Sequence, residues 1–319
     1  MRAVVFGEYG DRSVLNVQQR PDPKPGPGEA LVLVEASGVN YVDVYQRDGT
    51  YQVPLPAVLG SEGAGTVLSF GDGVRGLAPG DRVAWAGIRG SHAEQALVPA
   101  DRLVPVPAEV TTEQAAAVLL QGLTAHYLTH DSFAVRPGRV VLVHAAAGGM
   151  GQLLTRIVTH LGGRVVATAS TPGKRELALA AGAVRAVPYA EALDAVREVT
   201  GGAGADAVYD GVGADTFDAS LEALRPRGTL VLFGAASGKV APFDPLRLMA
   251  GSYFLTRPTL GHFIASRTEL LERAETLFGW VADGIVDAAV TGRYPLDAVA
   301  DAYAALEGRE STGKLLITP

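Results

Sequence analysis

The sequence predicts an α/β protein with two domains: a β-rich, partly barrel-like domain and a doubly wound parallel sheet covered by helices. Short strand-like runs broken by Gly and Pro occupy residues 1–107. Between residues 140 and 234, continuous apolar runs of strand length alternate with helical stretches, which indicates a parallel sheet buried on both faces. The 319 residues are also too many for one ordinary hydrophobic core.

The strands expected in the β-rich domain are short and are separated by turn residues. They lie at residues 2–6, 29–36, 63–70, 81–86 and 93–98. The proline-dense stretch RPDPKPGPGE at residues 20–29 is an exposed loop inside this domain, because strand signals continue on both sides of it.

From Thr111 the hydrophobic period becomes helical, with Thr111 or Thr112 as the N-cap and an end before Arg136. Buried strands are then expected at residues 140–146, 164–169, 183–188, 206–210 and 229–234. The helices between them are expected at residues 151–161, 173–181, 191–198 and 216–224. This alternation is typical of a nucleotide-binding domain.

The segment after residue 260 is expected to return to the first domain, with helices at 267–283 and 296–307 and a strand at 314–318. The predicted β-rich domain is therefore residues 1–120 with 261–319, and the predicted nucleotide-binding domain is residues 121–260. We expect the active site in the cleft between them.

Composition and charge narrow the possible chemistry. The chain has no cysteine, which excludes disulfides, thiolate nucleophiles and cysteine-ligated zinc. A net charge of -7 argues against nucleic acid as the main partner. No apolar run reaches the roughly 18 to 20 residues of a membrane span, and the apolar run near Met1 is too short for a signal peptide. We therefore expect a cytoplasmic protein that is not bound to a membrane.

The glycine-rich stretch at residues 146–151, Ala-Ala-Gly-Gly-Met-Gly, follows the first buried strand and opens the next helix. In such a turn, missing side chains let backbone N–H groups approach a pyrophosphate at the positive end of the helix. A tight turn that merely needs glycine is the simpler alternative. The following strand and the repeated strand–helix units favour a dinucleotide site.

The end of the second strand indicates which dinucleotide binds. An NAD-dependent enzyme usually places Asp or Glu there for the ribose hydroxyl, but residues 165–175 contain no acid. The chain instead has Ser170, Thr171, Lys174 and Arg175, which suit a 2′-phosphate. One charge-assisted hydrogen bond would favour NADPH about ten- to a hundredfold. A solvated first helical turn is the alternative for the two cations.

Several motifs together resemble the NADPH:quinone oxidoreductases, the zinc-free branch of the medium-chain dehydrogenase/reductase superfamily, which also contains zeta-crystallin. They are GVNYVDVYQRDGTY (38–51), GSEGAGTV (60–67), QGLTA (121–125), AAAGGMG (145–151), YDGVG (209–213), LTRPTL (255–260) and TGKLLITP (312–319). The resemblance runs through the whole chain. It implies a GroES-like catalytic domain and a Rossmann domain.

The resemblance also implies the residues that contact NADPH. Those for the pyrophosphate and its surroundings are Thr124, Gly148, Gly149 and Met150, and those for the 2′-phosphate are Ser170, Lys174 and Tyr189. The nicotinamide half is implied to contact Phe233, Gly234, Ser237, Phe254, Leu255 and Thr256, and Arg309 resembles a further cofactor-contacting arginine. Tyr189 as a strand cap and Phe233 as a core residue remain alternatives.

Asn40, Asp43 and Tyr51 are the catalytic candidates. Zinc-dependent relatives bind their metal through a Cys near Asn40 and a His in a G-H-E motif, whereas this chain has Ser61 before Glu62. We therefore predict no metal site and an acceptor that takes hydride with little help, such as a quinone. Asn40 and Tyr51 would orient the quinone oxygen. An Asn40 that only begins a helix is the alternative.

The leading hypothesis is thus NADPH-dependent quinone reduction by hydride transfer. The first alternative is reduction of activated C=C bonds in enones or enoyl thioesters, and the second is an RNA-binding or structural relative. His126 and His130 have the spacing of a zinc pair but lack a third ligand, so we expect no metal there. The resemblance also implies a homodimer formed by sheet edges near residues 235–260.

Overall fold

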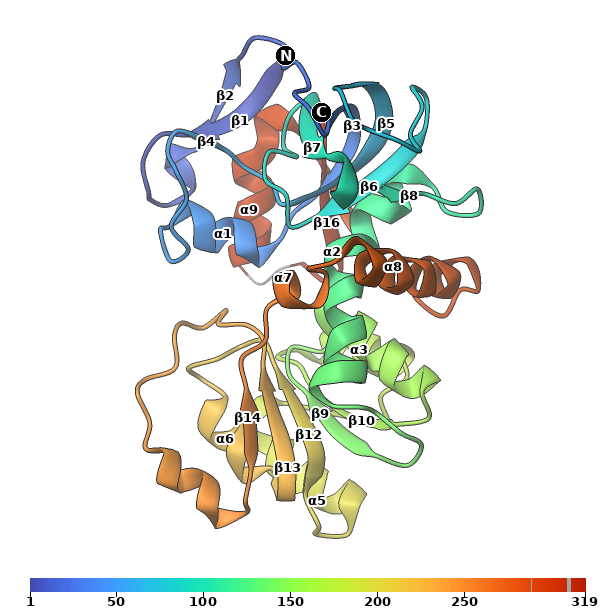
Figure 1. The fold of residues 1–319 in the computed structure, drawn as a ribbon. Coiled ribbons are helices and arrows are strands. Elements are labelled where there is room, and N and C mark those ends of the chain that lie inside the picture. The colour runs from blue at the N-terminus through green and yellow to red at the C-terminus, as the bar shows by residue number, and fades with distance from the viewer. Residues whose placement is uncertain (288, 309–310) are drawn as a thin grey trace. The chain divides into compact units, whose positions relative to one another are not determined.

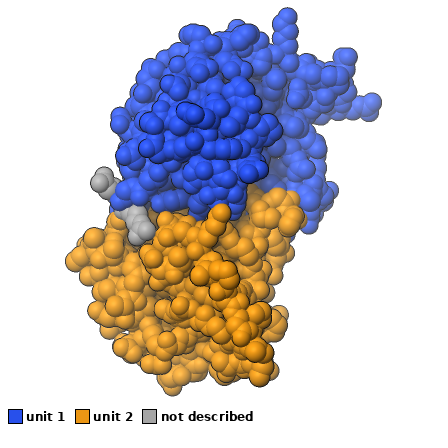
Figure 2. All heavy atoms as spheres, turned by 90° about the vertical axis from the view of Figure 1, so that its left-hand side faces the viewer, with its two compact units in different colours: residues 1–123, 264–319 blue, residues 124–263 orange. Residues whose placement is uncertain are grey.

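The computed structural model describes residues 1–287, 289–308 and 311–319. It divides into two compact units, which Figure 2 colours separately. Unit 1 comprises Met1–Leu123 and Ile264–Pro319, and unit 2 comprises Thr124–Phe263. None of the helices in the described part of the chain has the length and hydrophobicity needed to span a membrane.

Unit 1 is built on a seven-stranded sheet in which β3 is central (Figure 1). Its strands are β3 (Glu29–Gly38), β5 (Glu62–Phe70), β6 (Arg82–Ala86), β7 (Gln95–Pro99), β8 (Val104–Pro105), β15 (Val290–Pro295) and β16 (Lys314–Thr318). A smaller sheet contains β1 (Arg2–Phe6), β2 (Asn16–Gln19) and β4 (Ala57–Val58). β16 pairs antiparallel with β3, so the later stretch of the chain completes the sheet that the first stretch begins.

The helices of unit 1 are α1 (Tyr41–Arg47), α8 (Arg267–Ala282) and α9 (Val299–Glu307), and α2 (Thr112–Tyr127) runs across the boundary between the units. Thr111 is the N-cap of α2: its hydroxyl accepts from the Gln114 N–H at 3.1 Å, and the Gln114 side chain accepts from the Thr111 N–H at 2.9 Å. This reciprocal capping box explains why the helix begins where the sequence predicts.

Unit 2 contains six parallel strands in the order β11-β10-β9-β12-β13-β14. They are β9 (Val140–Val143), β10 (Arg164–Thr168), β11 (Arg185–Val187), β12 (Ala205–Asp210), β13 (Leu224–Leu232) and β14 (Phe254–Thr256). The helices are α3 (Gly149–His160), α4 (Pro172–Ala180), α5 (Ala192–Thr200), α6 (Phe217–Glu222) and the short α7 (Leu260–Phe263). The predicted doubly wound sheet is confirmed.

Two predicted elements differ from the structure. The helix expected from Thr111 to before Arg136 leaves regular geometry after Tyr127 and continues as a wider π-type turn at Leu128–Ser132. There the Thr129 hydroxyl donates to the Ala125 carbonyl at 2.8 Å, a bond that competes with the helical pattern. The strand expected at 229–234 begins earlier, at Leu224, and β14 and β15 were not predicted because neither has a long apolar run.

Candidate active site and cofactor site

The glycine turn lies between β9 and α3, at the carboxyl end of a central strand of the parallel sheet. Gly148 is the N-cap of α3. A Cβ on Gly151 would collide with the backbone of Ala145 and Ala146, so glycine is required for the helix to pack this closely on the turn. A Cβ on Gly148 would meet only the Ala145 carbonyl, at 3.5 Å. A side chain is therefore absent on the open side of Gly148, at the start of α3, which fits the close approach of a pyrophosphate to a helix N-terminus.

The three residues predicted for the 2′-phosphate follow two neighbouring strands at the same edge of the sheet. Ser170 is exposed just after β10, and Lys174 lies in the first turn of α4. Thr171 caps that helix, because its hydroxyl accepts from the Lys174 N–H at 3.3 Å. Tyr189 comes two residues after β11, which pairs with β10. The fold thus brings Ser170, Lys174 and Tyr189 to one edge.

The residues predicted for the nicotinamide half are partly at this edge. Phe233 and Gly234 follow β13, and a Cβ on Gly234 would collide with the Gly211 carbonyl, so two backbone segments approach closely here. The Ser237 hydroxyl donates to the Val212 carbonyl at 2.9 Å and accepts from the Asp215 N–H at 3.0 Å. Those bonds give Ser237 a role in shaping the loop.

The remaining cofactor candidates are more scattered. Phe254 begins β14 at the open side of the sheet and is 61% exposed, while Leu255 packs against the core of unit 2. Thr256 pairs with Val231, one residue before the end of β13. Thr124 is half-buried in α2. The structure does not bring Phe254 to the edge with the glycine turn, and Arg309 lies outside the described residues.

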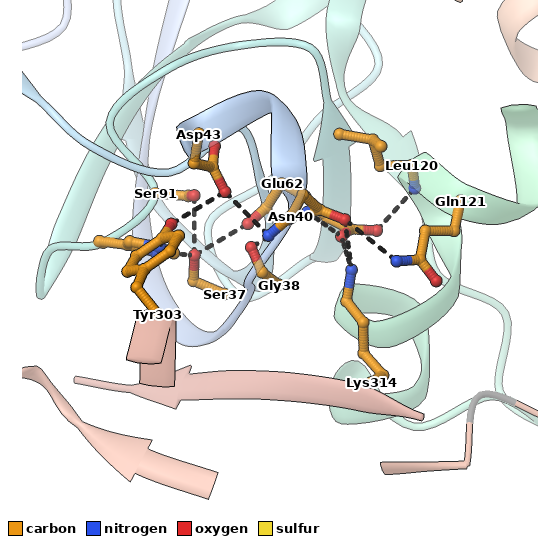
Figure 3. A network of polar contacts seen from close by, with 11 residues as sticks. Ser37, Gly38, Asn40, Asp43, Glu62, Ser91, Leu120, Gln121, Tyr303 and Lys314 are labelled. Atoms are coloured by element: carbon orange, nitrogen blue, oxygen red, sulfur yellow. Dashed lines mark hydrogen bonds and ion pairs between the residues drawn. The ribbon is translucent and has the colours of Figure 1, made fainter. Parts of the chain in front are cut away.

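Asn40 is almost completely buried in unit 1, at 3% exposure, just before α1 (Figure 3). Its amide donates to the Gly38 carbonyl at 3.1 Å and to the Glu62 carboxylate at 2.9 Å. Its carbonyl oxygen accepts from the Lys314 ammonium at 2.8 Å and from Gln121 at 3.4 Å. Both N–H bonds are therefore used within the protein, and Asn40 offers no donor to a quinone oxygen in this arrangement.

Lys314 and Glu62 form a fully buried ion pair beside Asn40. The Lys314 ammonium lies 2.6 Å from the Glu62 carboxylate, and the side chains are 1% and 0% exposed. The second oxygen of Glu62 accepts from the Leu120 N–H at 2.6 Å. A Cβ on Gly38 would collide with the Glu62 carboxylate and come within 2.8 Å of the Lys314 side chain, so glycine leaves the room for this pair. The charges are compensated by several hydrogen bonds, as a buried pair requires.

Asp43 begins a second chain of buried polar contacts. It accepts from the Asn40 N–H and from the Tyr303 hydroxyl, each at 3.0 Å. The Tyr303 hydroxyl also contacts His92 at 2.8 Å, and the other ring nitrogen of His92 contacts Ser37 at 2.6 Å. Burial raises the pKa of Asp43 to about 6 against the effect of these hydrogen bonds. Burial, helped by the charge of Lys314, lowers the pKa of His92 to about 3.

Tyr51 differs from the other two catalytic candidates because it is 45% exposed. Its ring packs edge-to-face on Tyr45, with centroids 5.3 Å apart, and Tyr45 in turn contacts Tyr41 at 6.2 Å. The backbone N–H of Tyr51 donates to the Tyr45 carbonyl at 2.7 Å. The ring is thus held while its surface stays accessible to a ligand.

Asn40, near which zinc-dependent relatives are expected to carry a Cys ligand, and Ser61, which stands in place of the His of the G-H-E motif, are both buried and hydrogen-bonded within the protein. Within residues 1–287, 289–308 and 311–319, no three His, Cys, Asp or Glu side chains gather as a metal site would need. His126 and His130 stack on each other with centroids 4.2 Å apart.

Sequence reasoning missed the residues that surround Asn40 and Asp43. Glu62, Gln121 and Lys314 each lie in a motif that carries the family resemblance, but their roles depend on contacts between residues 22 to 274 positions apart. A lysine that opens the apolar run KLLIT was the available signal, since a buried lysine needs a partner.

Comparison with known proteins agrees with this architecture. Residues 26–108 match the model of the alcohol dehydrogenase GroES-like domain, and residues 149–276 match that of the zinc-binding dehydrogenases. A quinone oxidoreductase of Pseudomonas aeruginosa is 38% identical over 100% of this chain and 99% of its own. A 2-haloacrylate reductase of a Burkholderia species is 38% identical over 92% of both chains.

Among solved structures, a mycobacterial protein in complex with NADPH has a TM-score of 0.97 to this chain. It is 47% identical, and the match covers 100% of both chains. Full-length identity at this level, the two matched domain models and the glycine turn at the carboxyl edge lead to one conclusion. This chain belongs to the quinone oxidoreductase family of the medium-chain dehydrogenase/reductase superfamily.

Proposed function

We propose that this protein is an NADPH-dependent oxidoreductase that reduces quinones without a metal ion. The observation that carries the proposal is the edge of the parallel sheet in unit 2. Three adjacent strands end at this edge, and they are followed by the glycine turn, by Ser170 and Lys174, and by Tyr189. The stretch from Val165 to Arg175 contains no acidic residue. A basic and hydroxyl-bearing edge suits a ribose 2′-phosphate and not a free 2′-hydroxyl.

The residues of this edge bind and orient the cofactor. Backbone N–H groups at Gly149 and Met150, at the start of α3, meet the pyrophosphate, and the ammonium of Lys174 meets the 2′-phosphate. NADPH bound there supplies a hydride to the acceptor. The loop that Ser237 fastens to Val212 shapes the nicotinamide end. Positioning provides most of the rate in such a reaction.

The acceptor meets the accessible hydroxyl of Tyr51, which donates a hydrogen bond as negative charge grows on the quinone oxygen. Asn40 is a positioning residue in this proposal, because its amide is fully used by Gly38, Glu62, Gln121 and Lys314. In this proposal the chemistry needs no metal, since the chain has no Cys and has Ser61 in place of the His of the G-H-E motif.

Steady-state kinetics with NADPH, NADH and a benzoquinone tests the cofactor assignment. Lys174→Ala should raise the KM for NADPH about ten- to a hundredfold and leave the KM for NADH within about twofold. Lys24→Ala is the matched control, because it removes another lysine from the proline-rich loop of unit 1. An enzyme that prefers NADH, or a Lys174→Ala variant with unchanged preference, would contradict the proposal.

Reduction of an activated C=C bond is the second candidate, because a relative of similar identity is a 2-haloacrylate reductase. One substrate panel under common conditions separates the two activities: it contains a benzoquinone, an enone and 2-chloroacrylate. Tyr51→Phe should lower kcat/KM for the quinone at least threefold, since it removes the proposed hydrogen bond to the acceptor. Turnover of the enone or chloroacrylate far above the quinone would favour the second candidate.

We also propose a homodimer joined at the open edge of the sheet in unit 2, and a cytoplasmic location, where NADPH is regenerated. The dimer is supported by β14, the last strand in the sheet order, which has a neighbour on one side only. Three large apolar side chains in and before this strand are well exposed: Leu246 at 67%, Met249 at 75% and Phe254 at 61%. An open strand with apolar neighbours is a template for pairing with a second copy.

A further inference from the structure

A buried histidine stacks on Tyr189, one of the predicted 2′-phosphate contacts, and is used by none of the proposed steps. His144 directly follows β9, before the glycine turn, and is 3% exposed. One ring nitrogen, Nδ1, lies 2.8 Å from the Thr168 hydroxyl, and the other, Nε2, lies 3.0 Å from the Ser220 hydroxyl. Both contacts come from buried side chains on other elements, β10 and α6.

The direction of these hydrogen bonds follows from Asp210. The Ser220 hydroxyl donates its only proton to the Asp210 carboxylate at 2.8 Å, so its oxygen must accept from the Nε2–H of His144. If the ring is neutral, Nδ1 then accepts from the Thr168 hydroxyl. Burial lowers the pKa of His144, which keeps the ring neutral near pH 7. The Thr168–His144–Ser220–Asp210 series is therefore a directed set of hydrogen bonds, here called the histidine chain.

Asp210 stands at the end of the histidine chain, where its carboxylate accepts the hydrogen bond from Ser220. Its carboxylate also accepts from the Val212 N–H at 2.8 Å, the Gly213 N–H at 3.0 Å and the Thr216 hydroxyl at 2.8 Å. The histidine chain thus links the carboxyl ends of β9, β10 and β12, where the dinucleotide is proposed to bind. Hydrogen bonds at both nitrogens fix the plane of the imidazole ring, which otherwise rotates in a broad energy well.

The fixed ring supports Tyr189. The Tyr189 and His144 rings stack with centroids 5.8 Å apart and planes inclined by only 17°. Tyr189 itself is half-buried in the short turn after β11, a place where the backbone alone leaves the side chain several rotamers. The histidine ring therefore gives the tyrosine ring a fixed surface nearly parallel to its own plane.

We propose that the histidine chain is a positioning device that holds Tyr189 ready for the 2′-phosphate, and so contributes to the preference for NADPH over NADH. The inference rests on the proposed function, because it uses Tyr189 as a phosphate contact. Holding one side chain in its binding orientation corresponds to about a three- to tenfold change in affinity.

Ser220→Ala tests this device without touching Tyr189 or the phosphate. The KM for NADPH should rise about three- to tenfold, while the KM for NADH changes less than twofold and kcat stays the same with both cofactors. Thr168→Val should act in the same direction, and Thr168→Ser should restore the preference because it keeps the hydroxyl. Thr200→Val is the matched control, since it removes a hydrogen-bonded hydroxyl of unit 2 at the end of α5.

A double-variant comparison adds a readout that general destabilisation would not move. Tyr189→Phe removes the proposed phosphate contact, so adding Ser220→Ala to it should give no further loss of NADPH preference. Equal losses with NADPH and NADH in Ser220→Ala would overturn the inference. If Ser220→Ala does not fold, Thr168→Val and Thr168→Ser test the inference instead, by the same comparison of KM for NADPH and NADH.

Failure of this inference can be told apart from failure of the proposed function. If Lys174→Ala lowers the NADPH preference and the histidine-chain variants do not, the positioning role is wrong and the cofactor site stands. If Lys174→Ala and Tyr189→Phe both leave the preference unchanged, the cofactor site itself is wrong, and the inference falls with it.

Discussion

Asn40 shows at the scale of single residues what a sequence can and cannot predict. Its place before a helix follows from its residue type, and α1 begins at Tyr41. The contacts of its amide do not follow, because Glu62, Gln121 and Lys314 reach it from elements far apart in the chain. The residue types therefore predicted a polar site. The solvent exposure of each side chain depends on tertiary contacts, which bury Asn40 and leave Tyr51 partly exposed.

Asp43 and His92 predict an unusual pH dependence of stability. The pKa of Asp43 is raised from 3.8 to about 6, so its contribution to stability falls as pH rises from about 4 to 6. The pKa of His92 is lowered from 6.5 to about 3, so its contribution grows as pH rises from about 3 to 6.5. Between pH 4 and 6 the two effects oppose each other.

Asp43→Asn should remove the opposing effect of the carboxyl, so that the pH dependence of stability due to His92 can be measured. Without the carboxyl, the free energy of unfolding should increase with pH between 4 and 6 more steeply than in the parent protein, by about 1.4 kcal/mol per pH unit. Urea unfolding at half-unit pH intervals measures this slope. Asp72→Asn, which changes an exposed carboxyl in a loop, should leave the parent profile intact. Parallel pH profiles for Asp43→Asn and the parent would refute the assignment of these two groups.

At the scale of elements, β9, β10 and β12 of unit 2 were predictable because each is a short, mainly apolar run, and the carboxyl ends of parallel strands meet at one edge of the sheet. The family resemblance implied that Ser170 and Tyr189 lie together, and the pairing of β10 with β11 gives the physical reason. The short strand β14 and the turn at Leu128–Ser132 could not be predicted, since pairing partners and local hydrogen bonds determine them. Sheet order likewise depends on contacts that no single segment contains.

Two helical glycines of unit 1 should respond in opposite ways to alanine. Gly279 is exposed in α8 and a Cβ there meets nothing within 4 Å, so Gly279→Ala should stabilise the protein by about 0.5 to 1 kcal/mol. Gly122 is buried in α2 and its Cβ would lie 2.5 Å from Leu277, so Gly122→Ala should destabilise it by about 1 to 3 kcal/mol. Denaturant midpoints of both variants measure the difference. Changes of the same sign would show that Gly122 is not the close contact between these helices.

At the scale of the whole molecule, the proposed dimer depends on the open edge of unit 2. Light scattering of the parent protein should give twice the chain mass of 33.0 kDa. Phe254→Lys should weaken dimerisation at least thirtyfold, as expected when a large apolar anchor of an interface is replaced by a charge.

Leu33→Lys is the control for this experiment. It places the same charge at an apolar residue of unit 1 that is 42% exposed, and it should not change the mass. A parent protein that is monomeric at micromolar concentration, or a Phe254→Lys variant that remains dimeric, would disprove this interface.

The division of unit 1 into two stretches has a consequence for how the protein is made. Lys314 follows Glu62 by 252 positions, so the ribosome completes all of unit 2 before it adds the ammonium group that neutralises the Glu62 carboxylate. On the nascent chain, unit 2 can fold early, whereas unit 1 must keep Glu62 hydrated and one side of Ser37 and Gly38 unpaired until β16 emerges. In newly synthesised molecules, unit 1 therefore remains incomplete, with the Glu62 carboxylate lacking its ammonium partner, until β16 has been made.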